Sequence, residues 1–175
     1  MTEPRTVPDE SDLRRHPAVA RVRAALADGG IETEVVVLDE HARTAASAAE
    51  QLGVTVAQIA NSLVFSVPDE GAPQGRTPLL VLTSGAHRVD TAKVAALVGT
   101  SRLDRADAAF VRERTGFAIG GVAPVGHVQP PRTLVDVTLA RHEVVWAAAG
   151  HPRTVFATTY EQLVRVTGGL PAEVA

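Results

Sequence analysis

The sequence has no cysteine and little of several other residue types. Without a thiol, the chain can hold no disulfide, no thiolate zinc site and no cysteine nucleophile. Only 3% of its residues are aromatic, so the core must be built from Val, Leu, Ala and Ile. Lys93 is the only lysine among 17 basic residues, so any lysine chemistry depends on that one side chain.

Long apolar runs and blocks of basic residues are also missing. No segment approaches the about 18 consecutive apolar residues of a membrane span, and the first residues lack the apolar stretch of a signal peptide. The formal net charge of −3 argues against wrapping of long nucleic acid by a basic face, but leaves room for contact with a nucleic-acid end. We therefore expect a cytoplasmic protein.

The length of 175 residues, of which 45% are hydrophobic, fits one domain. A core of this size buries roughly two thirds of the unfolded surface, so the chain needs no metal or partner in order to fold. Residues 1–12 are polar, contain proline and lack periodicity, which predicts a flexible N-terminal tail. Residues 13–175 are expected to form the domain.

Helices are expected where apolar residues recur at helical spacing between a capping residue and a glycine. The predicted helices run from Pro17 to the stop at Gly29-Gly30, and over residues 44–53, 55–60, 90–99, 104–114 and 159–166. In the fifth of these, Ala108, Phe110 and Val111 are expected to face inward. Each of these patterns is short, as in a compact mixed domain.

Strands are expected in short apolar or β-branched runs between turn residues. The predicted strands cover residues 34–38, 62–67, 78–83, 134–137, 143–148 and 153–157. The second and third are joined by a Pro- and Gly-containing turn at 68–78, which predicts a β-hairpin. The mixed order of helices and strands predicts an α+β domain with a central mixed, mainly antiparallel β-sheet flanked by helices.

The segment from Thr115 to His127 contains four glycines and Pro124, and neither helical nor strand periodicity. Glycines let a ligand approach backbone N–H groups closely, so such a loop suits an anionic oxygen or a carbonyl. It is no dinucleotide fingerprint, because no apolar strand leads into it, and no Walker loop, because the Gly-Lys-Ser/Thr ending is missing. On spacing alone, a purely structural turn is an equal alternative.

Within this segment, Gly120-Gly-Val-Ala-Pro-Val-Gly126 resembles the Gly-x-x-x-Pro-x-Gly signature of the YbaK/EbsC family, a domain also inserted in bacterial prolyl-tRNA synthetases. Asn61-Ser-Leu-Val-Phe65 is similar to the family's Lys-Ser-Leu-Val-Phe strand start, and Val89-Asp-Thr-Ala-Lys93 to its Val-Asp-x-x-Lys helix. Asp136 stands like the acidic residue after the glycine loop, and Gly150-His-Pro-Arg-Thr154 resembles a stretch of the alanine-editing branch.

The resemblance implies a trans-editing aminoacyl-tRNA deacylase, which hydrolyses the ester of a mischarged tRNA. The small residues of the glycine-rich loop predict a pocket for a small amino acid. The resemblance also implies that a water, or in some members the substrate's own side chain, attacks the ester carbonyl without a metal or cofactor. Backbone N–H groups of the glycine loop hold the carbonyl or oxyanion, and a hydroxyl of the terminal adenosine assists. The expected partners are the tRNA 3′ acceptor end and an aminoacyl-tRNA synthetase. The implied catalytic residues are Gly120, Gly121, Gly126 and Asn61, and the implied substrate-binding residues are Asp136, His151, Ser84 and Pro124.

Asn61 is the main departure from the family pattern, which has a lysine there to hold the terminal phosphate or the substrate. An asparagine donates a hydrogen bond but supplies no charge. Three alternatives follow: Asn61 suffices for a different substrate, an arginine substitutes from elsewhere, or turnover is lost. The last would leave a module that binds an aminoacyl-tRNA end, an amino acid or a nucleotide-like ligand. Lys93 is expected to be an ordinary helix lysine.

Other polar residues have competing interpretations. His151 is as consistent with lining the site as with a plain turn, and His127 is expected at the rim of the site rather than as a proton carrier. Ser84 and His87 lie close together, but without a Gly-x-Ser-x-Gly elbow they predict a turn and no triad. Four arginines before the glycine loop are either a solvated face or contacts for tRNA phosphates; they are Arg102, Arg105, Arg112 and Arg114.

Overall fold

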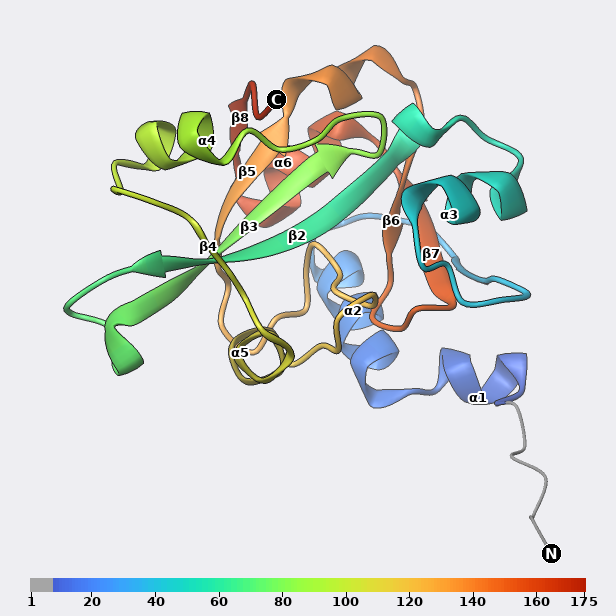
Figure 1. Ribbon diagram of the computed structural model, residues 1–175. Helices are drawn as coiled ribbons and strands as arrows, with labels where there is room; N and C mark the ends of the chain where they lie inside the picture. The colour runs from blue at the N-terminus through green and yellow to red at the C-terminus, as the bar shows by residue number, and fades with distance from the viewer. Residues whose placement is uncertain (1–7) are drawn as a thin grey trace, which may run out of the picture.

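Across residues 8–175, which the structure describes, eight strands form one mixed β-sheet with helices on both faces (Figure 1). The structure is a computed structural model. Residues 1–7 of the expected tail lie outside the described residues, and α1 (Glu10–Arg14) begins within the range 1–12 and crosses the expected boundary at residue 13.

The remaining elements follow in chain order. The helices are α2 (Pro17–Asp28), α3 (Ala45–Leu52), α4 (Thr91–Val98), α5 (Ala108–Thr115) and α6 (Tyr160–Thr167), with short 3-10 helices η1 (Val56–Gln58), η2 (Pro73–Gly75) and η3 (Val137–Arg141). The strands are β1 (Val35–Val37), β2 (Ile59–Pro68), β3 (Arg76–Ser84), β4 (Asp104–Arg105), β5 (Arg132–Asp136), β6 (Val145–Ala148), β7 (Thr154–Thr158) and β8 (Leu170–Ala172).

The sheet has the strand order β1-β7-β6-β2-β3-β5-β8, with β4 attached to β2. The pairs β1–β7, β6–β7, β2–β3 and β2–β4 are antiparallel, whereas β2–β6, β3–β5 and β5–β8 are parallel. The hairpin predicted from the Pro- and Gly-containing turn is present as β2 and β3, with Asn61 opposite Thr83. The predicted fold class, a mixed and mainly antiparallel sheet in an α+β domain, is confirmed.

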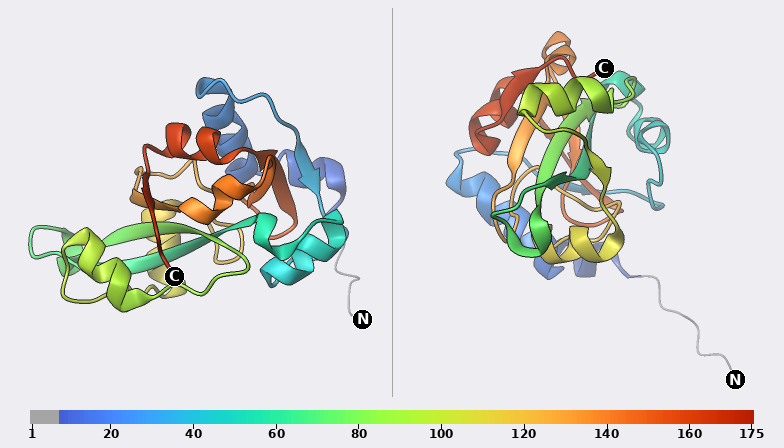
Figure 2. Two further views of the ribbon diagram at one scale, coloured as in Figure 1. Left: turned by 90° about the horizontal axis from the view of Figure 1, so that it is seen from above. Right: turned by 60° about the vertical axis from the view of Figure 1, so that its left-hand side comes forward.

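Alternation along β3 divides the core between the two faces of the sheet. Leu80 and Leu82 are fully buried in the main core, which also takes in α2, α6 and the inner residues of α5. Leu79 and Val81 point the other way and pack beneath α4. The views in Figure 2 show α2 and α6 on one side of the sheet and α4 on the other. The central strands are therefore covered on both faces.

One edge of β2 is paired at its two ends and open between them. At the start of the strand, Ile59 and Ala60 pair with β6, and farther along Phe65 and Ser66 pair with β4. Within the described residues, 61–64 have no strand partner on this edge. The sheet therefore opens there, and the glycine-rich segment and the N-terminus of α3 lie around the opening.

Three expectations for secondary structure were wrong in part. The helix predicted from residue 104 begins at Ala108, because Asp104 and Arg105 pair with β2 as β4 and Asp107 then caps the helix. Ala108 is consequently exposed in the first turn, although Phe110 and Val111 are buried as predicted. The helix expected over 55–60 ends at Gln58, because β2 begins at Ile59. Strand β8 was not foreseen.

Helix caps follow the sequence closely. The side chains of Thr44, Asp90 and Thr159 each accept a backbone N–H bond at the start of α3, α4 and α6. Gly53 and Gly99 end α3 and α4 in the left-handed conformation that glycine favours. All these helices are short, and none within residues 8–175 combines the length and apolarity that a membrane-spanning helix requires.

Candidate functional site

A cavity of about 440 Å³ occupies the opening beside β2. Its volume lies within the range of roughly 300–1,000 Å³ typical of small-molecule sites. The walls come from segments far apart in sequence: residues 42–45 and 48 around the start of α3, 59–63 of β2, Arg105 of β4, Ile119, Gly120 and Val122 of the glycine-rich segment, 146–148 of β6, and residues 151, 152, 154 and 155. The cavity therefore exists only in the folded domain.

Three of the expected site residues meet at this cavity: Asn61, Gly120 and His151. Asn61 is exposed, and its carboxamide has no hydrogen-bond partner within residues 8–175. An amide that lines a cavity without a protein partner is free to donate to a ligand oxygen. The position expected to hold the substrate thus faces the cavity.

The three glycines expected to form a cradle have different surroundings. Gly120 lines the cavity with a φ of +90°, and its N–H has no bonding partner in the described part of the chain. The Gly121 N–H instead donates to the Ala118 carbonyl at 3.0 Å. Gly126 lies against α2, where a Cβ would come within 3.1 Å of the backbone of Val22, and Gly126 is not among the residues that line the cavity.

Pro124 is buried in the glycine-rich segment and does not line the cavity. Its chain neighbours Ala123 and Val125 are both buried in the main core. Its side chain therefore has a place in packing the loop, and the structure does not bring it to the other expected substrate-binding residues.

His151 lies in a turn that fixes its ring. Its Nδ1 accepts the Arg153 N–H at 3.1 Å, so the proton of the neutral ring is assigned to Nε2. Burial lowers the pKa of His151, and the neighbouring His16, His41 and Arg153 lower it further. The rings of His16 and His41 lie 5.6 and 5.7 Å from that of His151. At neutral pH, His151 is thus an uncharged ring that can donate from Nε2.

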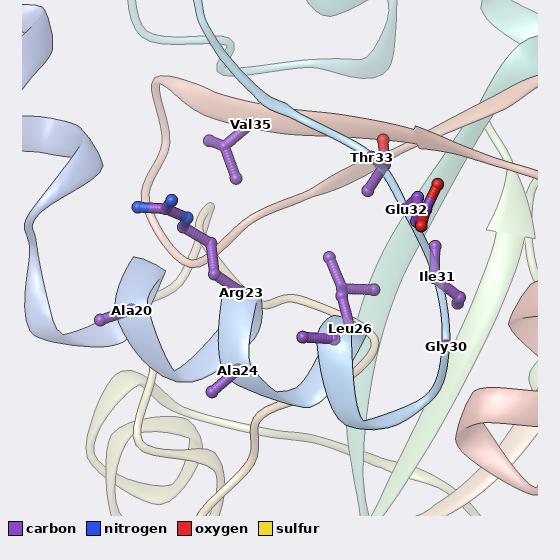
Figure 3. A pocket seen from close by; sticks show the side chains of 10 residues that line it. Ala20, Arg23, Ala24, Leu26, Gly30, Ile31, Glu32, Thr33 and Val35 are labelled. Atoms are coloured by element: carbon purple, nitrogen blue, oxygen red, sulfur yellow. The ribbon is translucent and has the colours of Figure 1, made fainter.

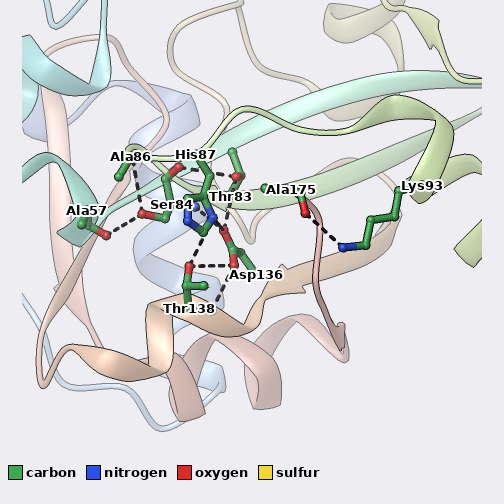
Figure 4. A network of polar contacts seen from close by, with 9 residues as sticks. All are labelled: Ala57, Thr83, Ser84, Ala86, His87, Lys93, Asp136, Thr138 and Ala175. Carbon is green, nitrogen blue, oxygen red and sulfur yellow. Dashed lines mark hydrogen bonds and ion pairs between the residues drawn. The ribbon is translucent and has the colours of Figure 1, made fainter.

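Asp136 lies in a separate buried network at the ends of β3 and β5 (Figure 4). Its Oδ2 accepts the Ser84 N–H and His87 Nδ1, both at 3.0 Å, and its Oδ1 accepts from the N–H and hydroxyl of Thr138. Burial alone would raise the pKa of Asp136, but these hydrogen bonds and His87 outweigh burial and lower it. Asp136 does not line the cavity with Asn61.

Ser84 belongs to the same network. It is 2% exposed, and its hydroxyl donates to the Ala57 carbonyl at 2.9 Å while accepting the Ala86 N–H. His87 binds Asp136 rather than the Ser84 hydroxyl (Figure 4). This arrangement matches the expected turn and has no serine nucleophile paired with a base.

Lys93 lies on α4 and does not line the cavity; Figure 4 shows it beside Ala175. Its Nζ donates to the Ala175 carbonyl at 3.0 Å and lies 3.7 Å from a carboxylate oxygen of Glu173. The chain's one lysine therefore ties α4 to the C-terminal segment.

Sequence reasoning did not assign four other side chains to this site. Arg43, Arg105 and Trp146 line the cavity, as does Ser62, whose buried hydroxyl has no partner in the described residues. Two features of the sequence could have drawn attention to Arg105 and Trp146: the basic surplus around Arg105 and the presence of only one tryptophan. Their location at the cavity could not be predicted, because it depends on how β4 and β6 pair with β2.

A second, larger hollow of about 680 Å³ lies between α2 and residues 30–35 (Figure 3). Its charged side chains are Arg23 and Glu32, which have opposite signs. The Thr33 hydroxyl beside them already donates to the Ala157 carbonyl. None of the expected site residues lines this hollow, and among residues 8–175 no group of three or more potential metal-binding side chains was found.

His127 follows the glycine-rich segment and is mostly enclosed by it. Its Nε2 donates to the Ala123 carbonyl, and its ring lies edge-on to Phe117 with centroids 5.1 Å apart. Burial lowers the pKa of His127; the bond to Ala123 partly opposes this, and the charge of Arg21 adds to it. His127 does not line the cavity.

We expect the free energy of unfolding to fall as the pH drops below 6.5, the ordinary pKa of histidine. Below pH 6.5 these histidines bind protons in the unfolded chain, whereas folded His127 and His151 resist protonation. Acid therefore favours the unfolded state. Above this pH both states are neutral at these groups and no effect arises. Urea denaturation at about pH 7.5, 6.5 and 5.5 measures the change.

A His127→Phe variant is the comparison, because it keeps a ring beside Phe117 but cannot titrate. Its stability is expected to fall less over the same pH interval. Equal slopes for the two proteins would show that His127 does not contribute, and a flat profile for the original protein would contradict the prediction for both histidines.

Comparison with known proteins places the chain in a family. The aminoacyl-tRNA editing domain matches residues 39–166, which include every strand that lines the cavity. A candidate trans-editing enzyme for prolyl-tRNA synthetase is 42% identical, with a TM-score of 0.80 over 90% of this chain and 96% of that one. A protein from a study of epitope grafting onto scaffolds is 39% identical, with a TM-score of 0.80 over 91% and 97% of the two chains.

YwhH of Bacillus subtilis (strain 168), described as uncharacterized, is 29% identical over 142 residues, or 81% of this chain and 86% of its own. These similarities extend over nearly the whole domain, as the resemblance seen in the sequence did. The chain belongs to the aminoacyl-tRNA editing domain family, the YbaK family.

Proposed function

We propose that this protein is a trans-editing aminoacyl-tRNA deacylase that hydrolyses the ester of a tRNA mischarged with a small amino acid. The observation that carries the proposal is the cavity beside β2, where the Asn61 carboxamide and the Gly120 N–H have no hydrogen-bond partner among residues 8–175. Membership of the editing-domain family supports an editing role. The similarity to a candidate trans-editing enzyme supports action on a separate, already charged tRNA.

The reaction requires a water to attack the ester carbonyl while donors stabilise the developing oxyanion. Gly120 N–H and the Asn61 carboxamide are the free donors we assign to this oxygen. Removing one well-placed donor from an oxyanion hole typically costs about 3–4 kcal/mol of transition-state stabilisation. A site with few acid–base groups can therefore cleave an activated ester. A hydroxyl of the terminal ribose of the tRNA assists the attacking water. The neutral ring of His151 can donate a further hydrogen bond to the substrate from Nε2.

The role assigned to the glycines is narrower than the sequence suggested. Gly120 is the cradle donor, whereas Gly121 and Gly126 shape the loop that holds it, since Gly121 packs on His151 and Gly126 on α2. We assign Asp136, Ser84 and Pro124 an indirect role, in fixing the strands and loop around the cavity.

The walls of the cavity are largely apolar, which suits the uncharged side chain of a small aminoacyl group. Alanines contribute much of the lining, from α3 and the residues before it, from β2 and from β6; they are Ala42, Ala45, Ala48, Ala60, Ala147 and Ala148. Trp146 and Ile119 add the larger apolar surfaces. The aminoacyl end of a tRNA is the partner we propose for this cavity, with an aminoacyl-tRNA synthetase as a second partner that supplies the substrate.

Deacylation of tRNAs charged with Ala, Ser, Cys, Thr or Pro tests the proposal. We expect release of one small amino acid, and about a 100-fold lower rate for Asn61→Ala, because one oxyanion donor is lost. Gln129→Ala is the matched control, since it removes an exposed amide that does not line the cavity. Its rate should equal that of the unaltered protein.

The alternative is a family member that binds its ligand without turnover, because Asn61 replaces the family lysine. A folded protein that releases none of the five amino acids would contradict the deacylase proposal. A marked gain of hydrolysis in Asn61→Lys would then identify a binding module that keeps the scaffold of the enzyme.

A further inference from the structure

The charged side chains of the cavity beside β2 are all basic. They are Arg43 and Arg105, and no aspartate or glutamate of the described chain lines the cavity. The whole protein has a formal net charge of −3, so this bias does not follow from composition. A pocket that concentrates one sign of charge attracts ligands of the opposite sign.

Arg105 has no ion-pair or hydrogen-bond partner among residues 8–175 and is exposed. Its neighbour Asp104 is the nearest carboxylate in sequence, but both oxygens of Asp104 accept from Arg102 Nε at 3.0 Å. Successive strand residues also point to opposite faces, which separates the Asp104 and Arg105 side chains. The guanidinium of Arg105 is therefore left free at the cavity.

Strand pairing places Arg105 near the end of the same β2 segment that carries Asn61. Arg105 is opposite Phe65, and Phe65 and Asn61 share a face because they are four residues apart. Four residues of strand span about 13 Å. Both side chains line the one cavity, so a ligand that touches Asn61 lies within the field of Arg105.

We propose that Arg105, with Arg43 as a second cation, binds a phosphate of the ligand and supplies the positive charge that Asn61 lacks. This inference rests on the proposed function, in which the phosphate is that of the terminal adenosine of the tRNA. A guanidinium binds a phosphate in a bidentate manner and stays charged at every physiological pH. The charge is thus provided from β4 instead of β2.

Binding of adenosine 5′-monophosphate and of adenosine, followed by calorimetry and by fluorescence, tests the proposal. Trp146 is the only tryptophan in the sequence and lines the cavity, so its emission reports directly on occupancy. We expect the monophosphate to bind more tightly than adenosine. Arg105→Ala should weaken monophosphate binding by about 10- to 100-fold, the range for a lost charge-assisted bond, and leave adenosine binding unchanged.

Two further variants make the test specific. Arg112→Ala removes an exposed arginine of α5 that does not line the cavity, and should bind the monophosphate normally. Asn61→Lys, introduced into Arg105→Ala, should restore monophosphate affinity at least tenfold, because it returns a cation to the same cavity. A merely structural role for Arg105 would not be rescued in this way.

Equal binding of the two ligands, no binding of the monophosphate, or unchanged affinity in Arg105→Ala would each overturn the proposal. These outcomes are distinct from failure of the deacylase proposal. A protein that binds the monophosphate through Arg105 but releases no amino acid from charged tRNA would contradict only the enzyme activity. A protein that deacylates equally well with and without Arg105 would contradict only the phosphate site.

Discussion

Asp136→Ala is expected to lower the free energy of unfolding by about 3–5 kcal/mol, the range for removing one partner of a buried charged network. Asp136 is 1% exposed, and its oxygens accept from the backbone of Ser84 and Thr138, from two threonine hydroxyls and from His87. Removing the carboxylate leaves the buried Ser84 N–H without its acceptor and takes the same acceptor from Thr138, His87 and the Thr83 hydroxyl, of which the last keeps only the Ser84 carbonyl. Denaturation with urea measures the loss.

Asp104→Ala is the matched control for this experiment. Asp104 is a partly exposed aspartate, and its partner Arg102 is exposed, so its loss should cost only about 0–1 kcal/mol. A similar small cost for Asp136→Ala would show that the network contributes little to stability. A protein of unchanged stability but lost deacylation would instead restore the expectation that Asp136 acts on the substrate.

Gly121→Ala is expected to have the second largest effect, a loss of about 3 kcal/mol in stability together with loss of deacylation. A Cβ at this position would lie 2.9 Å from the Cα of His151 and 3.1 Å from its backbone N and C. The obstacle is backbone, so no side-chain rotation relieves it. The loop and the turn of His151 must separate, which moves Gly120 and His151 away from their positions at the cavity.

Gly71→Ala is the comparison, because Gly71 lies in an exposed turn and its added Cβ would make only an ordinary 3.5 Å contact with Asp69. Its stability should change by less than about 0.5 kcal/mol. The amide of Gly121 donates to Ala118 and is unaltered by the substitution. Lost activity would therefore report on close packing, and full activity in Gly121→Ala would contradict this account.

Much of the fold was predictable because local signals and tertiary structure agree. Thr44, Asp90 and Thr159 cap helices as expected, and the turn at 68–78 joins two strands into the predicted hairpin. The errors arise where strand pairing, and not the local sequence, determines the secondary structure. Asp104 and Arg105 look like the start of a helix until β2 is available as a partner, and β8 has no pattern of its own and depends on β5.

The site was predictable only in part. A motif identifies residues that are close in sequence, so it led to Gly120, Asn61 and His151, which meet at the cavity. The same reasoning also selected Asp136 and Ser84, which belong to a buried network nearby. A sequence does not tell whether a polar residue faces a ligand or the core. Arg43, Arg105 and Trp146 carry no motif, and only the folded chain brings them together.

The opening in the sheet beside β2 also bears on how readily this protein can change its ligand. Residue 61 has no strand partner on the open edge, and its side chain makes no hydrogen bond within residues 8–175, so substitutions there disturb little of the fold. An asparagine, a lysine or a serine can occupy it at similar stability. The position can thus vary under selection for substrate alone, while the surrounding strands keep the domain intact.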